Sequence, residues 1–279
     1  MAFATRVVPV LVLAALAAPD ARAQEEAPAH AAPAQQAEPS HGLRHLLDVM
    51  EVVDTPVFSR NTLQLKYEWT GKPAGASSSE LTFKPTFAWG KNREFALRVE
   101  MPVETVYPSP SVGPAASGFA SLTTTFFWVF HDEKGLRLGA GLELQWNTAT
   151  IPAVGAPWII EPVVGIGYRF DKWVGVTLEV NWQKSFGNLG TYLPVNTIQF
   201  KPVVSVALPA WFFVSVQDKI SWSLENDDVG SLLKFTAGRF LTEHKSVVLA
   251  VEYETPLDPV AARGEIMMVG VLLSYFFAW

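Results

Sequence analysis

The segment MMVGVLLSYFFAW, residues 267–279, ends the chain and places an apolar side chain at every second position. A period of two is the pattern of a β-strand, because successive side chains of a strand point to opposite faces of the sheet. The alternating set consists of Met267, Val269, Val271, Leu273, Tyr275, Phe277 and Trp279. The segment therefore predicts a strand with one continuous apolar face that ends on an aromatic residue.

The same pattern fills the chain upstream of this segment. In the first repeat Leu63, Leu65 and Tyr67 alternate with Gln64 and Lys66. Twelve such segments can be marked, at residues 60–70, 79–90, 93–107, 118–130, 135–148, 157–170, 172–185, 195–208, 211–223, 231–241, 245–255 and 264–279. Because polar or Gly/Pro-containing connections separate them, we expect an all-β antiparallel meander over residues 59–279.

Alternation alone fits either a soluble barrel with its apolar face inside or a membrane barrel with its apolar face outside. The connections decide between them, because their lengths alternate. The long ones span 71–78, 108–117, 149–156, 186–194, 224–230 and 256–263, and the short ones span 91–92, 131–134, 171, 209–210 and 242–244. Long loops at one end and short turns at the other are typical of outer-membrane barrels. We therefore predict a 12-stranded transmembrane β-barrel.

All 10 tryptophans lie near the ends of the predicted strands. Five flank long connections: Trp69, Trp146, Trp158, Trp182 and Trp222. The other five flank short turns or end the chain: Trp89, Trp128, Trp173, Trp211 and Trp279. Tryptophan favours the boundary between lipid and water, so this distribution predicts two aromatic girdles.

The C-terminal segment resembles the terminal signature of Gram-negative outer-membrane barrels, which implies recognition of the last strand by the barrel-assembly machinery. The order of features is also similar to the outer-membrane family named for the MetA pathway of phenol degradation. Four stretches carry that resemblance: LRVEMPVE at 97–104, GFASLTTTFFWVF at 118–130, LGAGLEL at 138–144 and EPVVGIGYRF at 161–170. The family has a Gly-Asp pair where this chain has Ala120 and Ser121. The resemblance implies a porin-like transporter for small aromatic compounds.

The N-terminal region divides into three parts. Residues 1–23 have a basic residue, an apolar stretch and the small-x-small site Ala21-Arg22-Ala23, which together predict a secretory signal peptide. Residues 24–40 are rich in Ala, Pro, Gln and Glu and are expected to form a disordered lead. Residues 41–55 predict a short amphipathic helix that either plugs the barrel or lies on the membrane. Its apolar stripe is Leu43, Leu46, Leu47, Met50 and Val53.

Composition excludes several classes of protein. The 279 residues include no cysteine, 49% are hydrophobic, 17% are charged, and the formal net charge is −6. A disulfide scaffold is therefore excluded, and the acidic balance argues against a nucleic-acid partner. We expect outer-membrane lipid, lipopolysaccharide and a small-molecule solute as the partners, in the outer membrane of a Gram-negative cell.

The charged faces of the strands become the wall of the lumen. The acidic members are Glu68, Glu80, Glu100, Glu104, Glu143, Glu161, Glu179, Glu252 and Glu254, and the basic members are Lys66, Lys84, Arg98, Arg137, Lys184, Lys201, Lys219 and Lys234. A selectivity filter for ions would need rings of one sign, whereas here the signs are mixed. Mutual pairing in a narrow hydrated interior is the interpretation that we favour. Alternation places one acid, Asp218, on the lipid side, so we expect either a bulge there or a position near the interface.

Covalent chemistry finds little support in the sequence. A serine hydrolase needs a histidine within hydrogen-bond reach of its serine, but the 5 histidines lie in the lead, the short helix and two short turns. His131 and His244, in those turns, lack a ligand set for zinc. The acidic loop at residues 225–228 matches no known calcium loop, so we expect neither a metal nor a cofactor. The sequence thus predicts a porin-like channel, with a sealed structural or assembly barrel and an outer-membrane lipid hydrolase as alternatives.

Overall fold

The fold was analysed in a computed structural model that describes residues 60–90, 93–108, 114–170, 173–187, 192–242, 246–263 and 265–277. The predicted signal peptide, disordered lead and amphipathic helix lie outside the described residues, as does Trp279. Within the described ranges no helix is long and apolar enough to cross a membrane.

Strands make up most of the described chain. They are β1 (Thr62–Gly71), β2 (Ser77–Trp89), β3 (Phe95–Tyr107), β4 (Ala116–Phe119), β5 (Leu122–Glu133), β6 (Leu136–Trp146), β7 (Trp158–Arg169), β8 (Val174–Phe186), β9 (Asn196–Ala207), β10 (Phe212–Ser223), β11 (Asp228–Phe240), β12 (Val247–Pro256) and β13 (Met267–Phe276). Four short 3-10 turns lie between them: η2 (Pro73–Gly75), η3 (Pro152–Val154), η4 (Pro209–Trp211) and η5 (Ala261–Arg263).

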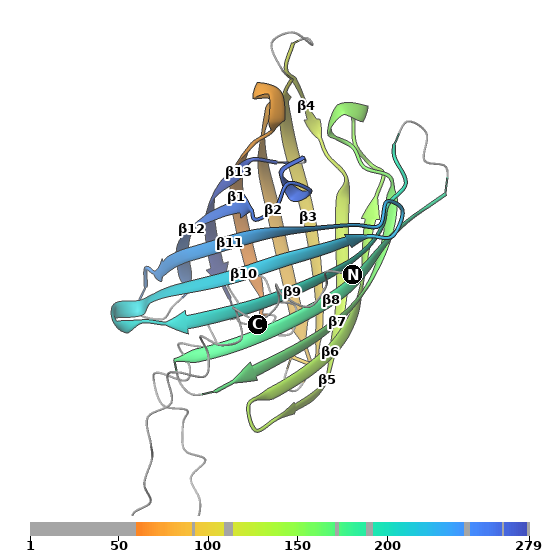
Figure 1. The fold of residues 1–279 in the computed structure, drawn as a ribbon. Helices are drawn as coiled ribbons and strands as arrows, with labels where there is room; N and C mark the ends of the chain where they lie inside the picture. Colours follow the sequence, from red (N-terminus) through yellow and green to blue (C-terminus); the bar gives the residue numbers. More distant parts are fainter. Residues whose placement is uncertain are drawn as a thin grey trace, which may run out of the picture. The chain divides into compact units, whose positions relative to one another are not determined.

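Neighbouring strands pair antiparallel throughout, and β1 also pairs with β13. The sheet therefore closes into a barrel with no free edge, as Figure 1 shows. Closure satisfies the backbone N–H and C=O groups that an open edge would leave unpaired. The predicted 12-stranded antiparallel barrel is confirmed, because β4 and β5 together form a single wall strand beside β3.

The interruption between β4 and β5 differs from the single strand that we predict at 118–130. Val103 pairs with Phe119 on one side of it and Glu100 pairs with Thr123 on the other, so the register shifts by one residue. The extra residue is accommodated where Ala120 donates its N–H to the carbonyl of Pro102 at 3.0 Å. A β-bulge of this kind exchanges the two faces of the strand. The bulge lies at Ala120-Ser121, where the outer-membrane family that the sequence resembles has a Gly-Asp pair.

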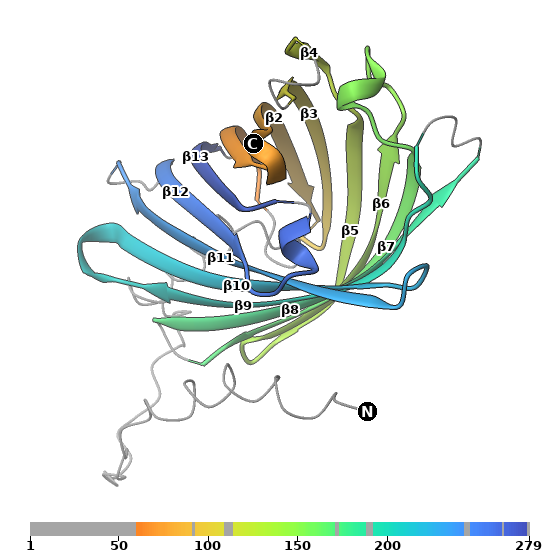
Figure 2. The same ribbon diagram turned by 45° about the horizontal axis from the view of Figure 1, so that its top comes forward.

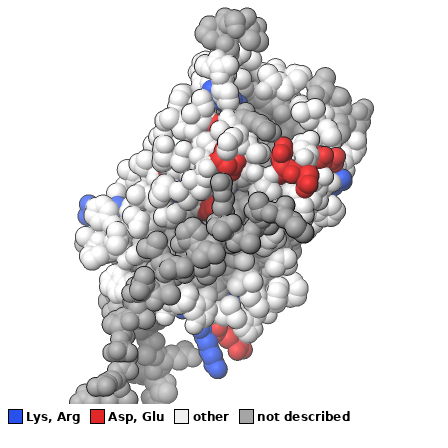
Figure 3. All heavy atoms as spheres, in the orientation of Figure 1, with Lys and Arg blue, Asp and Glu red and all other residues white. Residues whose placement is uncertain are grey.

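The outward face of the barrel is apolar. Leu65, Phe126, Val164, Val251 and Leu273 are all exposed and alternate with buried neighbours. Figure 3 shows that most of the visible wall carries no charged atoms. An exposed apolar band of this extent is far larger than soluble monomers show, and it requires a lipid cover.

Seven tryptophans lie on this outward face, near the strand ends: Trp69, Trp89, Trp128, Trp146, Trp158, Trp182 and Trp222. Trp173 and Trp211 differ from the predicted girdle, because both pack against a cluster of buried apolar side chains. Trp211 also has a positive φ of 67°. The sequence could not show this, because both residues lie in turns, where the alternation that separates inside from outside is lost.

The connections define two ends of the barrel. One end, here called the loop end, carries the connections 72–76, 108–115, 147–157, 187–195, 224–227 and 257–266. The opposite end, the short-turn end, carries 90–94, 134–135, 170–173, 208–211 and 241–246, and β1 begins and β13 ends there. In Figure 2 the turns η2, in orange, and η5, in blue, appear at the loop end.

Asp218 lies on an unbent part of β10. The pairing of β10 with β9 has the same register at Gln217 and at Ile220, so no bulge turns the side chain inward. Asp218 pairs with Leu233, which pairs in turn with Thr255, the penultimate residue of β12. Its Oδ1 accepts a hydrogen bond of 2.5 Å from the hydroxyl of Ser231. Of the two expected arrangements, a bulge or a position near the membrane interface, the structure shows the second: Asp218 lies on a regular strand toward the loop end.

Candidate functional site

The charges of the predicted lumen wall lie on the inward-facing side of their strands. The burial of successive residues places Lys66, Glu68, Glu80, Lys84, Arg98, Glu100, Glu104, Arg137, Glu143, Glu161, Glu179, Lys201, Lys219, Lys234, Glu252 and Glu254 on this side. Lys184 is the exception and corrects our assignment. It has the same parity as the exposed Trp182 on β8 and so faces outward.

The first charge network, network A, joins β1, β11 and β12. The ammonium of Lys66 lies 2.8 Å from carboxylate oxygens of both Glu68 and Glu252. Lys234 lies 2.8 Å from the other oxygen of Glu252. Strand β13 runs between β1 and β12, and its residue in register with Glu68 and Glu252 is Gly270. Because Gly270 has no side chain, the lysine can reach across β13 to Glu252.

The second charge network, network B, occupies β7, β8 and β9. Lys201 lies 2.8 Å from Glu179 and 4.0 Å from Glu161. Glu161 also accepts hydrogen bonds from Asn181 and, at 2.7 Å, from Gln183. The buried carboxylate of Glu161 therefore has both a cation and neutral donors around it, which offsets the cost of its desolvation.

Three carboxylates form a row on adjacent strands. Glu68 pairs in register with Glu80, and Glu80 pairs with Glu104. Glu80 accepts a hydrogen bond of 2.5 Å from Thr82, and Glu104 lies 3.9 Å from the ammonium of Lys72. Glu68 shares Lys66 with Glu252, and Lys72 comes no closer than 3.9 Å to Glu104, so the three carboxylates are only partly neutralised and give one side of the lumen a negative surface.

The remaining inward charges have local partners. Lys84 lies 3.1 Å from Glu100, and Arg137 lies 3.2 Å from Asp132. Glu143 accepts a hydrogen bond of 2.7 Å from Thr125. The mixed signs of the wall thus largely satisfy one another across the ladder, as cross-strand pairs in a sheet can.

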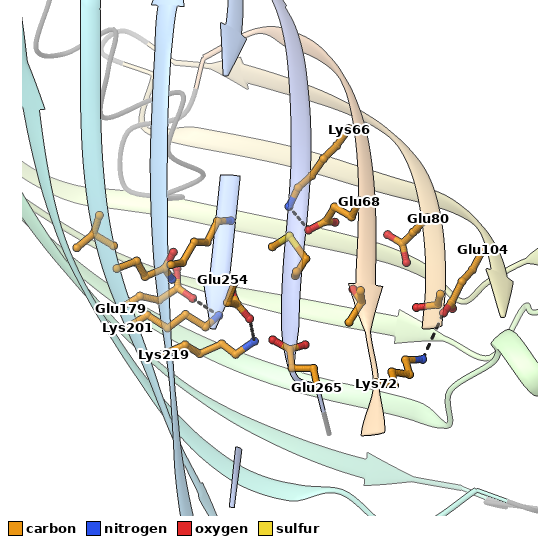
Figure 4. A pocket seen from close by; sticks show the side chains of 16 residues that line it. Lys66, Glu68, Lys72, Glu80, Glu104, Glu179, Lys201, Lys219, Glu254 and Glu265 are labelled. Atoms are coloured by element: carbon orange, nitrogen blue, oxygen red, sulfur yellow. Dashed lines mark hydrogen bonds and ion pairs between the residues drawn. The ribbon is translucent and has the colours of Figure 1, made fainter. Parts of the chain in front are cut away.

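The carboxylate row and several members of networks A and B surround a cavity of about 450 Å³ (Figure 4). Charged side chains from eight strands and two loop-end connections line it. They are Lys66, Glu68, Lys72, Glu80, Glu104, Glu179, Lys201, Lys219, Lys234, Glu254 and Glu265. The volume suits a small organic solute, and the lining combines both signs of charge.

The inward face changes character toward the short-turn end, where apolar side chains replace charges. A buried cluster contains Phe127, Val129, Val163, Ala207, Phe213, Phe240, Val248, Ala250, Leu272 and Phe276. The ring centroids of Phe213 and Phe240 are 5.9 Å apart, and those of Phe240 and Phe276 are 6.4 Å apart. The lumen therefore has a charged region toward the loop end, and toward the short-turn end it has an apolar cluster together with the buried charges of Lys84 and Arg137.

Glycines shape the apolar region. A Cβ added at Gly238 would lie 2.5 Å from Cζ of Phe213, and one added at Gly139 would lie 2.3 Å from Cε1 of Phe127. Both distances are far below a carbon–carbon contact. The phenyl rings therefore occupy the space that a side chain would fill at these glycines of the neighbouring strand.

The alternation of the strands did not reveal this apolar cluster. The available signal was the doubled aromatic residue, in Phe126-Phe127, Phe212-Phe213 and Phe276-Phe277. Adjacent residues of a strand face opposite sides, so one ring of each pair must point inward. Phe127, Phe213 and Phe276 are those rings.

Neither a metal centre nor a hydrolase site emerges from the described residues. Within them, no group of three or more His, Asp or Glu side chains could hold a metal ion. Asp227 of the acidic loop instead accepts a hydrogen bond of 3.2 Å from the indole of Trp222. His131 lies in β5 at the short-turn end, and no hydrogen bond joins it to a serine in the described ranges. The other histidines lie outside those ranges.

Solved structures share the fold. The COG4313 outer membrane channel from Pseudomonas putida F1 has a TM-score of 0.64 at 12% identity, over 78% of this chain and 96% of that one. The NanC porin has a TM-score of 0.54 at 10% identity, over 78% and 100%. The KdgM porin has a TM-score of 0.53 at 9% identity, over 78% and 99%. No family model and no curated protein matches the chain. The chain therefore has the fold of outer-membrane porin-like channels.

Proposed function

We propose that the protein is a porin-like channel of the Gram-negative outer membrane that passes small solutes, aromatic or hydrophobic ones among them. The charged cavity inside a closed, lipid-covered barrel carries this proposal. The named channels and porins with the same fold support it, as does the resemblance to the MetA-pathway family. The loop end faces the exterior, and the short-turn end faces the periplasm.

The partners in this proposal follow from the same features. Outer-membrane lipid and lipopolysaccharide surround the apolar wall after export through residues 1–23. The C-terminal strand, which includes Tyr275 on the outward face, is the segment that the barrel-assembly machinery receives.

The direct test is single-channel recording of the full mature chain in planar bilayers, with solute uptake measured in liposomes. We expect discrete conductance steps and faster uptake of small aromatic solutes than in empty liposomes. A correctly folded barrel without conductance and without solute uptake would contradict the proposal.

A sealed envelope barrel is the second candidate, and the apolar cluster favours it. Phe213, Phe240 and Phe276 are at most 5% exposed, so the side chains around them leave little open space beside these rings. The double variant Phe213→Ala, Phe240→Ala separates the two candidates. A channel that already conducts should gain conductance, whereas a sealed barrel should conduct only after the substitution.

The predicted helix at residues 41–55 adds a further element to the proposal. We infer that its apolar stripe enters the barrel as a partial plug, with interfacial binding as the competing arrangement. Deletion of residues 24–55 should raise conductance if the helix is a plug. Unchanged permeability in a folded deletion variant would contradict the plug.

A further inference from the structure

The charges around the cavity are divided between two parts of the barrel. Strands β1–β3, with the connection after β1, contribute three glutamates and two lysines, here called the acidic face: Glu68, Glu80, Glu104, Lys66 and Lys72. Strands β8–β12 contribute three lysines and two glutamates, here called the basic face: Lys201, Lys219, Lys234, Glu179 and Glu254. Each face therefore carries an excess of one charge, and the two excesses have opposite signs.

The two faces lie on nearly opposite sides of the lumen. In one direction around the ring, β1, β13, β12 and β11 separate β2 from β10, and in the other direction six wall strands do, with β4 and β5 counted as one. Figure 4 shows Glu80 and Glu104 on one side of the cavity and Lys201 and Lys219 on the other. A solute in the cavity therefore has a negative surface on one side and a positive surface on the other.

Glu80 is the carboxylate of the acidic face with the weakest compensation. It lies in register between Glu68 and Glu104. Each of those two has an ammonium group within 3.9 Å, whereas no ion pair among the described residues includes Glu80. Its hydrogen-bond donor is the hydroxyl of Thr82, at 2.5 Å. A neutral donor leaves the negative charge in place, so Glu80 favours a cationic group of a solute.

Lys219 has the corresponding role on the basic face. Lys201 and Lys234 each lie 2.8 Å from a carboxylate oxygen and are tightly paired. Lys219 lies 3.6 Å from Glu254, longer than the roughly 2.7–2.9 Å of a charge-assisted hydrogen bond. Its side chain is 32% exposed, against 14% for Lys234. A carboxylate of a solute can therefore reach Lys219 without breaking a tight ion pair.

The connection after β12 narrows the lumen beside the basic face. Its turn η5 packs against β11. A Cβ added at Gly230 would lie 3.1 Å from the backbone N of Ala261, and Gly230 shares the inward-facing parity of Thr236 on β11. The turn, drawn in blue near the centre of Figure 2, therefore lies inside the barrel wall. Because β11 pairs with β10, the narrowed space lies next to the strand that carries Lys219.

We propose that the cavity binds a dipolar solute whose ammonium group and carboxylate lie several atoms apart, such as an ω-amino acid or a short peptide. The ammonium group contacts Glu80, and the carboxylate contacts Lys219. The uncharged middle of the solute meets Val203 and Met268, which also line the cavity. The inference rests on the proposed channel function for the route by which the solute enters.

The arrangement of the charges favours a dipolar solute over an ion. A solute with a single charge is attracted by one face and repelled by the other, whereas a dipolar solute oriented across the lumen is attracted by both. The distance between its two charges matters as well. An α-amino acid carries both charges on one carbon atom, so it meets only one face at a time.

Four probes of similar size test the charge pattern. They are ε-aminocaproate, its isomer norleucine, which carries both charges at one end, and the single ions caproate and hexylammonium. Calorimetric titration of the full mature chain in detergent micelles measures their affinities. We expect ε-aminocaproate to bind at least about threefold more tightly than each of the other three, because it alone makes both charge contacts.

Two variants assign the contacts. Glu80→Gln should weaken the binding of ε-aminocaproate and hexylammonium at least about threefold and leave caproate unchanged. Lys219→Gln should weaken ε-aminocaproate and caproate by a similar factor and leave hexylammonium unchanged. The unchanged ion in each case shows that the variant is folded. Glu225→Gln, in an exposed loop, and Lys184→Gln, on the outward face, are the matched controls and should bind all four probes as the wild type does.

The outcomes separate this binding site from the channel. Equal affinities for ε-aminocaproate and norleucine, no binding of any probe, or the same loss of caproate and hexylammonium in both variants would overturn the site. Calorimetry requires no open pore, so selective binding without conductance would contradict the channel alone. Conductance without a preference for ε-aminocaproate would contradict the binding site alone.

Discussion

Single residues set the properties of this lumen because each buried charge depends on one or two partners. Glu252 is bound by Lys66 and Lys234, but the two lysines differ in what else they contact. Lys66 also has Glu68 at 2.8 Å, whereas Glu252 is the carboxylate that pairs with Lys234. Loss of Glu252 would therefore leave Lys234 as the less compensated charge.

The variant Glu252→Gln should lower the free energy of unfolding by about 3 kcal/mol, because a charge whose buried partner is removed keeps its desolvation cost. Urea unfolding in lipid vesicles, followed by tryptophan fluorescence, measures this change. Glu225→Gln, on an exposed loop, should change it by less than about 0.5 kcal/mol. Equal effects of the two substitutions would argue against network A as a source of stability.

Close packing of Phe213 against Gly238 is the basis of a second prediction. Gly238→Ala should destabilise the barrel by about 1–3 kcal/mol, because the new methyl group would overlap the ring. Addition of Phe213→Leu should recover part of this loss by removing the ring atoms that clash. The same vesicle unfolding assay gives both values. If the double variant were no more stable than Gly238→Ala, overlap with the ring of Phe213 would not be the cause of the destabilisation.

At the scale of the strand, alternation decides which face meets lipid. Val251, in the middle of β12, is 51% exposed between the buried Ala250 and Glu252. Val251→Lys should cost about 2–4 kcal/mol, the range for a lysine facing lipid at the bilayer midplane. Val229→Lys, near the loop end of β11, should cost only about 0–1 kcal/mol. Similar costs at the two positions would contradict the assigned membrane depth.

The same alternation explains which parts of the fold could be predicted. It identified the strands and the inward position of residues such as Glu161 and Lys201, because one face meets lipid and the other does not. It could not show the bulge at Ala120, which depends on the carbonyl of Pro102 on another strand. Lys184 was misplaced because polarity was taken as a sign of an inward position, although near a rim a lysine can face outward.

The contacts within the site were less predictable than its composition. The reach of Lys66 to Glu252 needs Gly270 on the strand between them, and that depends on the register of three strands. The inward fold of the connection 257–266 depends on Gly230, which the sequence marks only as one glycine among 19. Local sequence patterns therefore could not predict which distant segments contact one another.

At the scale of the whole molecule, the balance of charges controls ion selectivity. The cavity is lined by five lysines and six glutamates, and burial together with the neighbouring Glu254 raises the pKa of Glu265 to about 7, so that Glu265 is mostly neutral below this pH. Five positive charges then face five negative ones, so the wild-type channel should prefer neither cations nor anions strongly. Selectivity should respond to a change of sign at one residue of the mouth.

Lys72 is the residue that tests this balance best. Its side chain is 35% exposed and lies 3.9 Å from Glu104, so replacing it breaks no buried ion pair. Lys72→Glu should raise the ratio of potassium to chloride permeability by about twofold or more, because it extends the negative row of Glu68, Glu80 and Glu104 to the mouth. Reversal potentials under a KCl gradient measure this ratio. Lys184→Glu, outside the lumen, should leave it unchanged, and a shift in that control equal to the shift in Lys72→Glu would show that ions do not pass through this cavity.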